Sequence, residues 1–572
     1  MKLSPHWIRD FVDLTVDDRR LAEDLTDIGL GVEGISGAGA DTVFEMEIGT
    51  NRPDAMNHYG VAREAAAVYD LPLKQLTPSL PSVAKATSGK ASGGTAEAVP
   101  FPIVVEEPQL CPRFSARVIR DTKIKPSPEK ITHRLQLLDQ RPISNAVDAT
   151  NYILWEIGKP THVFDLDLLE GGKIIVRKAH AGETLKTLDG VERKLTTEDL
   201  VVCDAKKPVG LAGVMGGYHT MITEKTRNIL IESAWWDPIT VRKMSRRHGI
   251  HTDASHRFER GADFESCPLS CDLVAQMILD SGGGELVGGI VDVVSKKLDQ
   301  APVLLHVSEV RRILGGNLDA GQIFRLLKRL GFDLIPEGQG DTEKDAQFRV
   351  HIPSWRLDVE REIDVIEEIA RLHGYDKFEK TLPAYNGAVV ELPHAVMDAA
   401  LRGRALAVGY NEALSLTFIS HQDAEKFSTS GTKVLELENP LSEEASVMRT
   451  SLVPGMLDML AWNLNRDVAE ARLFEMGGVY EYKGGESAEP IRIEPRRACL
   501  GATAEAVKAA LAASGSLDVS KGEHAAAAEA FRAYEASRGA DRLARIYIER
   551  CERFIASPPP PDWNGVQAYD HK

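Results

Sequence analysis

The spacing of apolar and polar positions predicts several α+β domains in succession. Residues 1–80 combine helical patterns with a strand-like run, "TVFEMEIG", and an alanine-rich helix after "TNRPDAMNH". Residues 81–99 are rich in Ser, Gly and Ala and poor in large apolar side chains, which predicts a flexible linker. We therefore expect an N-terminal α+β domain that ends near residue 80.

Residues 100–297 predict a larger domain of mixed strands and helices. Short apolar runs are separated by Gly, Asp and Pro turns, as in "KIIVRKA", "DLVVCD" and "NILIESAWW". Helical patterns interrupt them at "PSPEKITHRLQLL" and at "CPLSCDLVAQMILDSGGG", where the glycines suit a helix end. These features are typical of an α+β domain of about 200 residues.

Two further α+β units and a tail follow. Residues 298–380 predict three helices and a strand, "FRVHIPSW", and the third helix is expected to begin between Val359 and Arg361. Residues 381–500 predict helices at "HAVMDAALRGRALAVGY" and "SLVPGMLDMLAWNLNR", with strands at "EALSLTFIS" and "ARLFEMGGVYEY". Residues 501–572 have a different composition and predict a helical tail.

Composition narrows the class of protein. The 572 residues are too many for one hydrophobic core, and 43% apolar with 27% charged residues is typical of a soluble globular protein. The chain has no apolar run long enough to span a membrane, and its first residues lack the pattern of a signal peptide. We therefore expect a cytoplasmic protein with no membrane partner.

Charge and cysteine content exclude some kinds of site. The six cysteines are scattered and form no CxxC pair, which argues against a disulfide framework or a zinc ribbon. A net charge of −17 argues against a uniformly basic nucleic-acid surface. Residues 112–141 nevertheless carry eight Lys or Arg against three Asp or Glu, so they form either a local nucleic-acid patch or an ordinary solvated surface.

Acidic residues gather in "SWRLDVEREIDVIEEIARLHGYD". On a helix, three of them fall at i, i+3 and i+4 on one face, where their charges repel. A hard cation such as Mg²⁺ would relieve that repulsion; alternatively, the first residue caps the helix and Arg361 and Arg371 balance the others on a wet surface. The four carboxylates are Asp358, Asp364, Glu367 and Glu368.

The segment 242–261, "RKMSRRHGIHTDASHRFERG", is a second candidate. His248, His251, His256 and Glu259 match no common zinc spacing. The arginines instead favour a loop that meets a phosphate-rich partner. A third candidate comprises "DATNYILWEIGKPTHVFDLD" and "VGLAGVMGG", where glycines permit close backbone approach and His162 is titratable.

Taken in order, these motifs resemble a known family. The segments "TNRPDAMNHYGVARE", "PTHVFDLD", "GLAGVMGG", "RRHGIHTDASHRFERG", "IPSWRLDVEREIDVIEEIARLHGYD" and "LENPLSEEASVMRTSLVPGML" closely resemble the β subunit of bacterial phenylalanyl-tRNA synthetase over about residues 1–500. The resemblance implies an α₂β₂ tetramer with an α subunit, which uses ATP to attach phenylalanine to tRNA(Phe). It also implies a winged-helix-like domain at 298–380 and an inactive class II synthetase-like antiparallel sheet domain at 381–500.

The resemblance also assigns roles to residues. The aminoacylation site is expected in the α subunit, because 381–500 contain no GxGxxxR segment. The domain at 100–297 is expected to hydrolyse tRNA mischarged with tyrosine, since a phenyl pocket cannot strongly exclude a ring with one added hydroxyl. By resemblance, Asp358, Asp364, Glu367 and Glu368 are the ligands of a structural Mg²⁺.

Five positions match the family's editing site. Glu232 is expected to accept the hydrogen of the tyrosine hydroxyl. Gly216 and Ala254 are expected to leave room for the ring. His162 and Thr252 are expected to orient the ester and a water molecule. In order, the five are His162, Gly216, Glu232, Thr252 and Ala254.

The sequence also departs from the family. Only about a dozen residues occupy the place of an inserted oligonucleotide-binding domain, and 501–572 resemble the helical ends of some bacterial nucleotide cyclases instead of the usual C-terminal anticodon-binding domain. An alternative to the synthetase subunit is therefore a degenerate stand-alone tRNA-binding or interaction protein.

Overall fold

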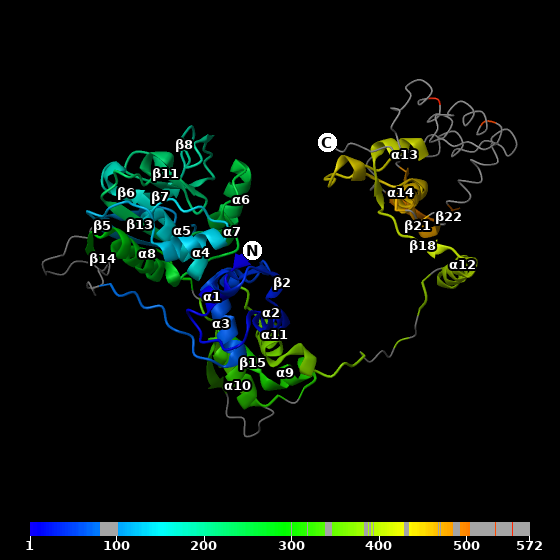
Figure 1. Cartoon of the computed structure of the whole chain (residues 1–572), viewed down its shortest axis with the longest axis horizontal. Helices are drawn as coiled ribbons and strands as arrows, with labels where there is room; N and C mark the ends of the chain where they lie inside the picture. The colour runs from blue at the N-terminus through cyan, green and yellow to red at the C-terminus, as the bar shows by residue number, and fades with distance from the viewer. Residues whose placement is uncertain are drawn as a thin grey trace. The chain divides into compact units, whose positions relative to one another are not determined.

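The computed structural model describes residues 1–80, 101–298, 300–316, 318–337, 346–382, 387, 390–392, 394–427, 434–466, 468, 471–483, 492–503, 532 and 552. The linker expected at 81–99 and nearly all of the tail expected at 501–572 lie outside these residues. Mixed α+β modules make up the chain, which divides into two compact units, Met1–Pro383 and Ala384–Lys572 (Figure 1). No described helix has the length and apolar character needed to cross a membrane.

The first module is a small antiparallel sheet, in the order β1-β3-β2, with helices packed on it. Asn57 begins the alanine-rich helix α3 by accepting the Gly60 N–H, as an N-cap does. The elements are β1 (Lys2–Leu3), α1 (Pro5–Ile8), α2 (Asp18–Asp27), β2 (Gly31–Ser36), β3 (Val43–Glu47) and α3 (His58–Tyr69).

This first module shares its core with the second. Trp7 stacks on the His58 ring at 4.0 Å and contacts Tyr152 of the second module at 4.3 Å. The His58 ring also pairs with the Trp155 carbonyl at 2.7 Å. The N-terminal residues therefore form one packed body with the next module instead of a separately folded domain.

The second module contains two larger sheets, a two-stranded sheet of β8 and β9, and a helical layer. One sheet is antiparallel, in the order β14-β5-β13-β6, and the other has the order β12-β11-β10-β7-β4, with β4 and β7 parallel. Its strands are β4 (Ile103–Val105), β5 (Arg113–Arg120), β6 (His162–Asp165), β7 (Ile174–Lys178), β8 (Thr184–Lys186), β9 (Glu192–Lys194), β10 (Leu200–Cys203), β11 (Pro208–Leu211), β12 (Met215–Gly216), β13 (Ile229–Trp235) and β14 (Glu285–Val294). Its helices are α4 (Glu129–Leu137), α5 (Asn145–Ile157), α6 (Pro238–His248), α7 (Asp253–Phe258) and α8 (Ser266–Gly282).

Strand β13 joins two cores because successive side chains point to opposite faces. Ile229 and Ile231 belong to the core that contains α5 and α8. Leu230 and Ala234 belong to the core shared with the five-stranded sheet. The predicted strand "NILIESAWW" is confirmed as β13, and its period determines which residues face the second core.

The third module has the sheet order β15-β17-β16 and three helices around one apolar core. The predicted strand within "FRVHIPSW" is confirmed, and the third helix begins at Glu362, one residue beyond the expected range. The elements are β15 (Val303–His306), α9 (Val307–Leu314), α10 (Ala320–Arg329), β16 (Asp333–Glu337), β17 (Gln347–His351) and α11 (Glu362–His373).

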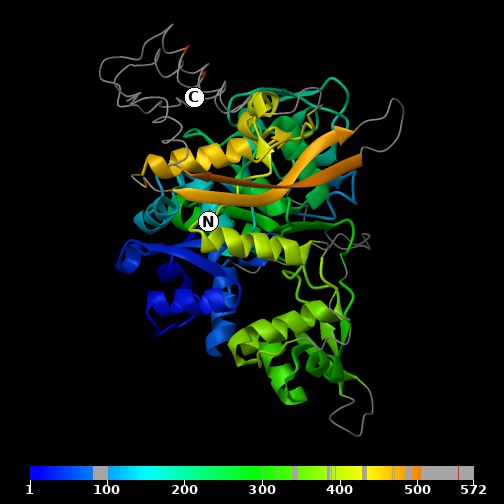
Figure 2. The ribbon, with the colours of Figure 1, turned by 90° about the vertical axis from the view of Figure 1, so that its right-hand side faces the viewer.

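The second unit is built on a long pair of strands, β21 and β22, with α14 packed beside them (Figure 2). The single strand expected over 412–420 is wrong. Instead, β18 pairs with β21 while β19 pairs with β20, because this segment crosses between two sheets. The elements are α12 (Ala395–Ala407), β18 (Asn411–Glu412), β19 (Phe418–Ile419), α13 (His421–Phe427), β20 (Val447–Met448), α14 (Val453–Leu464), β21 (Arg472–Lys483) and β22 (Arg492–Thr503).

Candidate functional site

The second module contains a cavity of about 320 Å³. Its walls come from α5, β6, the β11–β12 hairpin, β13 and the first turn of α7, most of which are labelled in Figure 1. The structure brings all five expected editing residues to this cavity: His162, Gly216, Glu232, Thr252 and Ala254.

Glu232 lies in an apolar interior because of its place on β13. It stands between Leu230 and Ala234 in the strand period, so its side chain shares their face. The residue is 7% exposed, and burial raises the pKa of its carboxyl to about 8. The carboxyl is therefore mostly neutral at pH 7, with one oxygen that accepts and one O–H that donates.

His162 is the cross-strand neighbour of Glu232. The two residues are directly paired between β6 and β13, so their side chains lie side by side on one face. The ring meets Phe164 edge-on at 4.5 Å, and burial lowers the pKa of His162 to about 4. Its Nε2 atom is buried and has no hydrogen-bond partner among the described residues. A neutral imidazole thus offers one unpaired nitrogen to a bound molecule.

Gly216 makes room for this imidazole. A Cβ atom at Gly216 would lie 2.3 Å from Cε1 and 2.6 Å from Nε2 of His162. Both distances are well inside van der Waals contact, so the ring occupies the space of the missing side chain. The orientation of His162 therefore depends on a glycine at this position.

Thr252 supports the cavity wall. Its Oγ1 donates to the Val214 carbonyl at 2.9 Å and accepts the Ser255 N–H at 3.0 Å, which caps α7. These contacts use the hydroxyl hydrogen and one lone pair, so the hydroxyl can take its expected role only by accepting a hydrogen bond, for example from a water molecule. Ala254 lies half-buried against the core beside the cavity.

Three polar residues of the cavity were missed, among them Thr150 on α5. The Thr161 hydroxyl is buried without a hydrogen-bond partner in the described part of the chain, and Asn151 lies on the α5 wall. All three belong to "DATNYILWEIGKPTHVFDLD", which the sequence marked as a candidate. The adjacency of Thr161 to His162 was the available signal.

The four acidic residues expected to bind Mg²⁺ do not form a ligand set within the described residues. Both oxygens of Asp358 accept N–H groups of Arg356 at 2.9 Å. Asp364 caps α11 by accepting the N–H groups of Glu360 and Arg361 at 3.1 and 2.8 Å. Glu367 is exposed on α11.

Glu368 is buried between arginines. It accepts hydrogen bonds from Arg356 at 2.8 Å and from Arg371 at 2.7 Å. Burial acts to raise the pKa of Glu368, but Arg371 and Arg356 lower it to about 2. Because guanidinium groups occupy the oxygens of Asp358 and Glu368, the residues of this chain do not fit a Mg²⁺ ion as arranged. Within the described residues these carboxylates form a network of buried ion pairs, and their role as Mg²⁺ ligands stays a prediction.

The segment 242–261, expected as a loop, forms α6 and α7. In the described part of the chain, only one group of three or more candidate ligand residues lies close enough to hold a metal: His251, His256 and Glu259. Glu259 is paired with Arg260 at 2.5 Å, which opposes a cation there. The fourth candidate, His248, instead contacts Asp199 at 2.9 Å.

The basic segment 112–141 is less open than its composition indicates. Three of its arginines are buried and ion-paired, at 3.0 Å to Asp292, 2.6 Å to Asp272 and 2.6 Å to Asp10. These three are Arg113, Arg117 and Arg134. They support the fold, so neither a continuous nucleic-acid patch nor a wholly solvated surface describes the segment.

Comparison with known families agrees with the order of the modules. A B3/4 domain matches residues 110–283, a tRNA synthetase B5 domain matches 303–375, and a phenylalanyl tRNA synthetase beta chain CLM domain matches 378–536. The last match continues past residue 500, where the sequence resemblance was expected to end.

Curated relatives point in the same direction. The chain is 39% identical over 483 residues to a phenylalanine–tRNA ligase beta subunit of Geobacter metallireducens, a match that covers 82% of the chain and 57% of the relative. It is 40% identical over 448 residues to the beta subunit of Carboxydothermus hydrogenoformans, with 78% and 54% covered. The chain thus spans little more than half the length of these relatives.

A solved N-terminal fragment of the phenylalanyl-tRNA synthetase beta subunit from Pyrococcus horikoshii is 14% identical, with a TM-score of 0.36 over 65% of this chain and 99% of the fragment. That score is too low to support an argument. By its three matched domains and its identity to curated relatives, the chain is similar over most of its length to phenylalanine–tRNA ligase β subunits.

Proposed function

We propose that this chain serves as the β subunit of a phenylalanine–tRNA ligase. It supports ATP-dependent charging of tRNA(Phe) by an α subunit in an α₂β₂ assembly in the cytoplasm, and it hydrolyses Tyr-tRNA(Phe). The observation that carries the editing part is that a neutral carboxyl and an unpaired imidazole face one cavity of about 320 Å³. The third module acts as a winged-helix-like scaffold, and the second unit as an inactive class II-like domain.

The cavity can select tyrosine over phenylalanine through Glu232. A buried phenol hydroxyl needs a hydrogen-bond partner, and leaving it unpaired costs about 1–3 kcal/mol. The neutral carboxyl accepts that hydrogen bond without the cost of burying a charge. Phenylalanine cannot make this contact, so correctly charged tRNA gains nothing from Glu232.

Hydrolysis itself requires the ester and a water molecule to be held together. His162 is neutral and has Nε2 unpaired, so it orients one of these groups by a hydrogen bond. Thr161 offers a second unpaired hydroxyl on the same wall. Thr252 keeps the hairpin carrying Gly216 in place, and no step passes through a metal.

Strands β2 and β3 are joined directly by residues 37–42, a connection with a short 3₁₀ turn, at the place where the family has an inserted domain. The tRNA acceptor end is proposed to meet the second module, because the candidate editing cavity lies there.

The test is co-expression with the α subunit from the same genome, scored for co-purification and for Phe-tRNA(Phe) formation. A stable complex that charges tRNA is the expected result. Failure of the two chains to assemble would favour the stand-alone tRNA-binding alternative.

A second measurement isolates editing in the assembled protein. Glu232→Ala is expected to slow deacylation of Tyr-tRNA(Phe) roughly tenfold to a hundredfold, as the loss of one buried hydrogen bond predicts. Glu232→Gln keeps a neutral acceptor of the same size and is expected to retain more activity. Unchanged deacylation by Glu232→Ala would refute the role of Glu232.

A further inference from the structure

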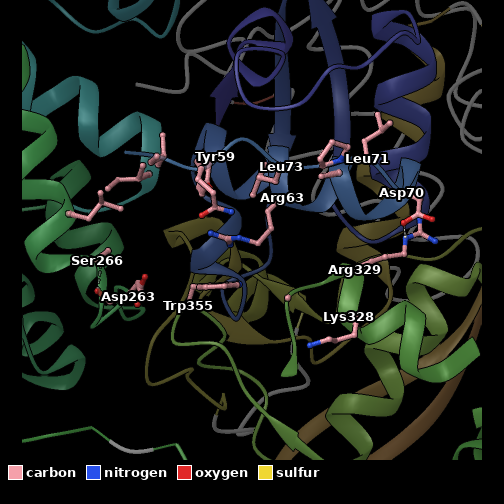
Figure 3. Close-up of a pocket in the computed structure, with 17 residues that line it drawn as sticks. Tyr59, Arg63, Asp70, Leu71, Leu73, Asp263, Ser266, Lys328, Arg329 and Trp355 are labelled. Atoms are coloured by element: carbon pink, nitrogen blue, oxygen red, sulfur yellow. Dashed lines mark hydrogen bonds and ion pairs between the residues drawn. The ribbon is translucent and has the colours of Figure 1, made fainter. Parts of the chain in front are cut away.

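A second and larger cavity, of about 690 Å³, lies in the Met1–Pro383 unit (Figure 3). It is bounded by α3, the extended segment 71–76, the start of α8, the end of α10 and Trp355. None of the five proposed editing residues lines it. The cavity is therefore separate from the candidate editing site.

Arg63 of α3 points into this cavity between two aromatic rings. Its guanidinium carbon lies 4.2 Å from the centroid of Trp355 and 5.6 Å from that of Tyr59. The Nη1 atom is shielded from solvent and has no hydrogen-bond partner among the described residues, and the described residues give Arg63 no ion pair. Burial lowers the pKa of Arg63, although Asp54 and Asp263 oppose this at longer range. Arg63 is partly exposed as a residue, so only its Nη1 atom lacks both solvent and a hydrogen-bond partner, which is unfavourable for that donor.

Trp355 contributes a second unpaired donor. Its indole Nε1 is buried and has no partner in the described part of the chain. Gly331 also lies close to the ring, since an added Cβ there would be 3.0 Å from the indole. Trp355 therefore contacts the Arg63 guanidinium while its own N–H has no partner in the described part of the chain.

The other cations of the cavity are already paired. Lys328 contacts Asp333 at 2.7 Å. Arg329 lies 3.4 Å from Asp70 and donates to the Val68 carbonyl at 2.7 Å. The donors left without a hydrogen bond are Nη1 of Arg63, Nε1 of Trp355 and Nε of Arg329, and the Asp263 carboxylate lines the same cavity. These donors suit a ligand with acceptor atoms.

Another arginine that lies on a tryptophan ring, Arg134, has hydrogen-bond partners, so the lack of a partner at Arg63 does not follow from stacking alone. Arg134 lies 4.8 Å from the centroid of Trp7, at a distance similar to that of Arg63 from its tryptophan. Its guanidinium donates to the Tyr152 hydroxyl at 2.7 Å and to Asp10 at 2.6 Å. A buried arginine on a tryptophan can thus be fully paired by this fold.

We propose that the cavity binds a small organic oxyanion, a carboxylate or a phosphate carried on an apolar or aromatic body. The oxyanion accepts hydrogen bonds from Nη1 of Arg63 and Nε1 of Trp355, a geometry suited to the planar guanidinium. The body lies against Leu71, Leu73 and Leu76 of the extended segment. The volume lies within the range of small-molecule sites.

The test titrates the full chain with two probes, AMP for the phosphate and benzoate for the carboxylate, and follows binding by isothermal titration calorimetry at constant ionic strength. At least one probe is expected to bind. Arg63→Met should weaken that binding roughly tenfold to a hundredfold, as loss of a charge-assisted hydrogen bond predicts. The matched variant Arg134→Met should bind as the unaltered chain does.

Thermal unfolding without ligand provides an independent readout. Arg63→Met removes an unpaired charge, so its melting temperature should equal or exceed that of the unaltered chain. Arg134→Met leaves Asp10 without this ion-pair partner and should lower the melting temperature. Trp355→Phe keeps the stacking ring, removes the N–H and should weaken probe binding.

Three results would overturn the proposal. The first is that neither AMP nor benzoate binds, and the second is that Arg63→Met binds the probe as well as the unaltered chain does. The third is that Arg63→Met lowers the melting temperature as much as Arg134→Met, since the guanidinium would then be part of the structural core.

Discussion

Replacing Gly216 by alanine tests the geometry of the smaller cavity most directly. The added Cβ would lie 2.3 Å from Cε1 of His162, more than 1 Å inside ordinary carbon–carbon contact, which is about 3.5 Å. Either the imidazole must leave its position or β12 must lift from β11. Overpacking of this kind costs about 1–3 kcal/mol, and a displaced ring would fill part of the cavity.

The matched control is Gly210→Ala on the paired strand. Gly210 lies directly opposite Gly216 in the β11–β12 pair, yet a Cβ there would come no closer than 3.7 Å to another atom. Gly210→Ala should therefore change the free energy of unfolding by well under 1 kcal/mol.

The assay is urea unfolding of both variants, followed by deacylation of Tyr-tRNA(Phe) in complex with the α subunit. Gly216→Ala should lose stability and most of its deacylation, while Gly210→Ala, which lines the same cavity without a clash, should keep its stability and more of its deacylation. The reasoning would be refuted if the two variants unfolded at the same urea concentration and deacylated Tyr-tRNA(Phe) at the same rate.

Three further predictions concern stability. Because the folded-state pKa of Glu232, about 8, exceeds its ordinary value of 4.5, the stability associated with its neutral form is fully present below pH 4.5 and is lost as pH rises toward 8. With Glu232 unaltered, the free energy of unfolding should fall by up to about 1.4 kcal/mol per pH unit in that window. Glu232→Gln should abolish this fall, as measured by urea unfolding between pH 5 and 8. Thr252→Val should cost about 1–2 kcal/mol by removing the cap of α7 and the bond to Val214, whereas Thr252→Ser should be nearly neutral. Arg356→Met should cost about 3–5 kcal/mol by leaving Glu368 without one of its buried partners, and dialysis of the isolated chain against EDTA should leave its melting temperature unchanged.

Each of these predictions has a contrary outcome. An identical pH slope for Glu232→Gln would mean that the carboxyl is not held neutral. Equal stability of the Val and Ser variants at position 252 would remove the structural role of its hydroxyl. A lower melting temperature in EDTA would restore the Mg²⁺ interpretation of the carboxylates near Glu368.

Local patterns predicted many elements correctly. The glycines after "AQMILDS" mark the end of α8 at Gly282, and the apolar run "NILIESAWW" corresponds to β13. Periodicity and caps act over a few residues, so they can be read without knowing the fold. The strand expected over 412–420 failed because its pairing depends on two partners, β20 and β21, that lie later in the chain.

The candidate residues were also found from the sequence, but their contacts and protonation states were not. Family motifs named Glu232 and His162, whereas their direct pairing and opposite pKa shifts follow from the register of β6 on β13 and from burial. That these residues edit tRNA stays a prediction. The sequence also showed that several carboxylates share a helical face, but not that Arg356 and Arg371 contact Glu368 there.

The sequence by itself determined the α+β class, the helix and strand pattern of most described modules and the five expected residues that line the smaller cavity. Only the tertiary structure decided which charges are paired. Glu64 and Arg371 stand 307 positions apart and form a buried ion pair, while Arg63, next to Glu64 in the chain, has no partner among the described residues. Sequence neighbours on a helix point to different faces, so the partner and the protonation state of each side chain depend on what distant segments bring to that face.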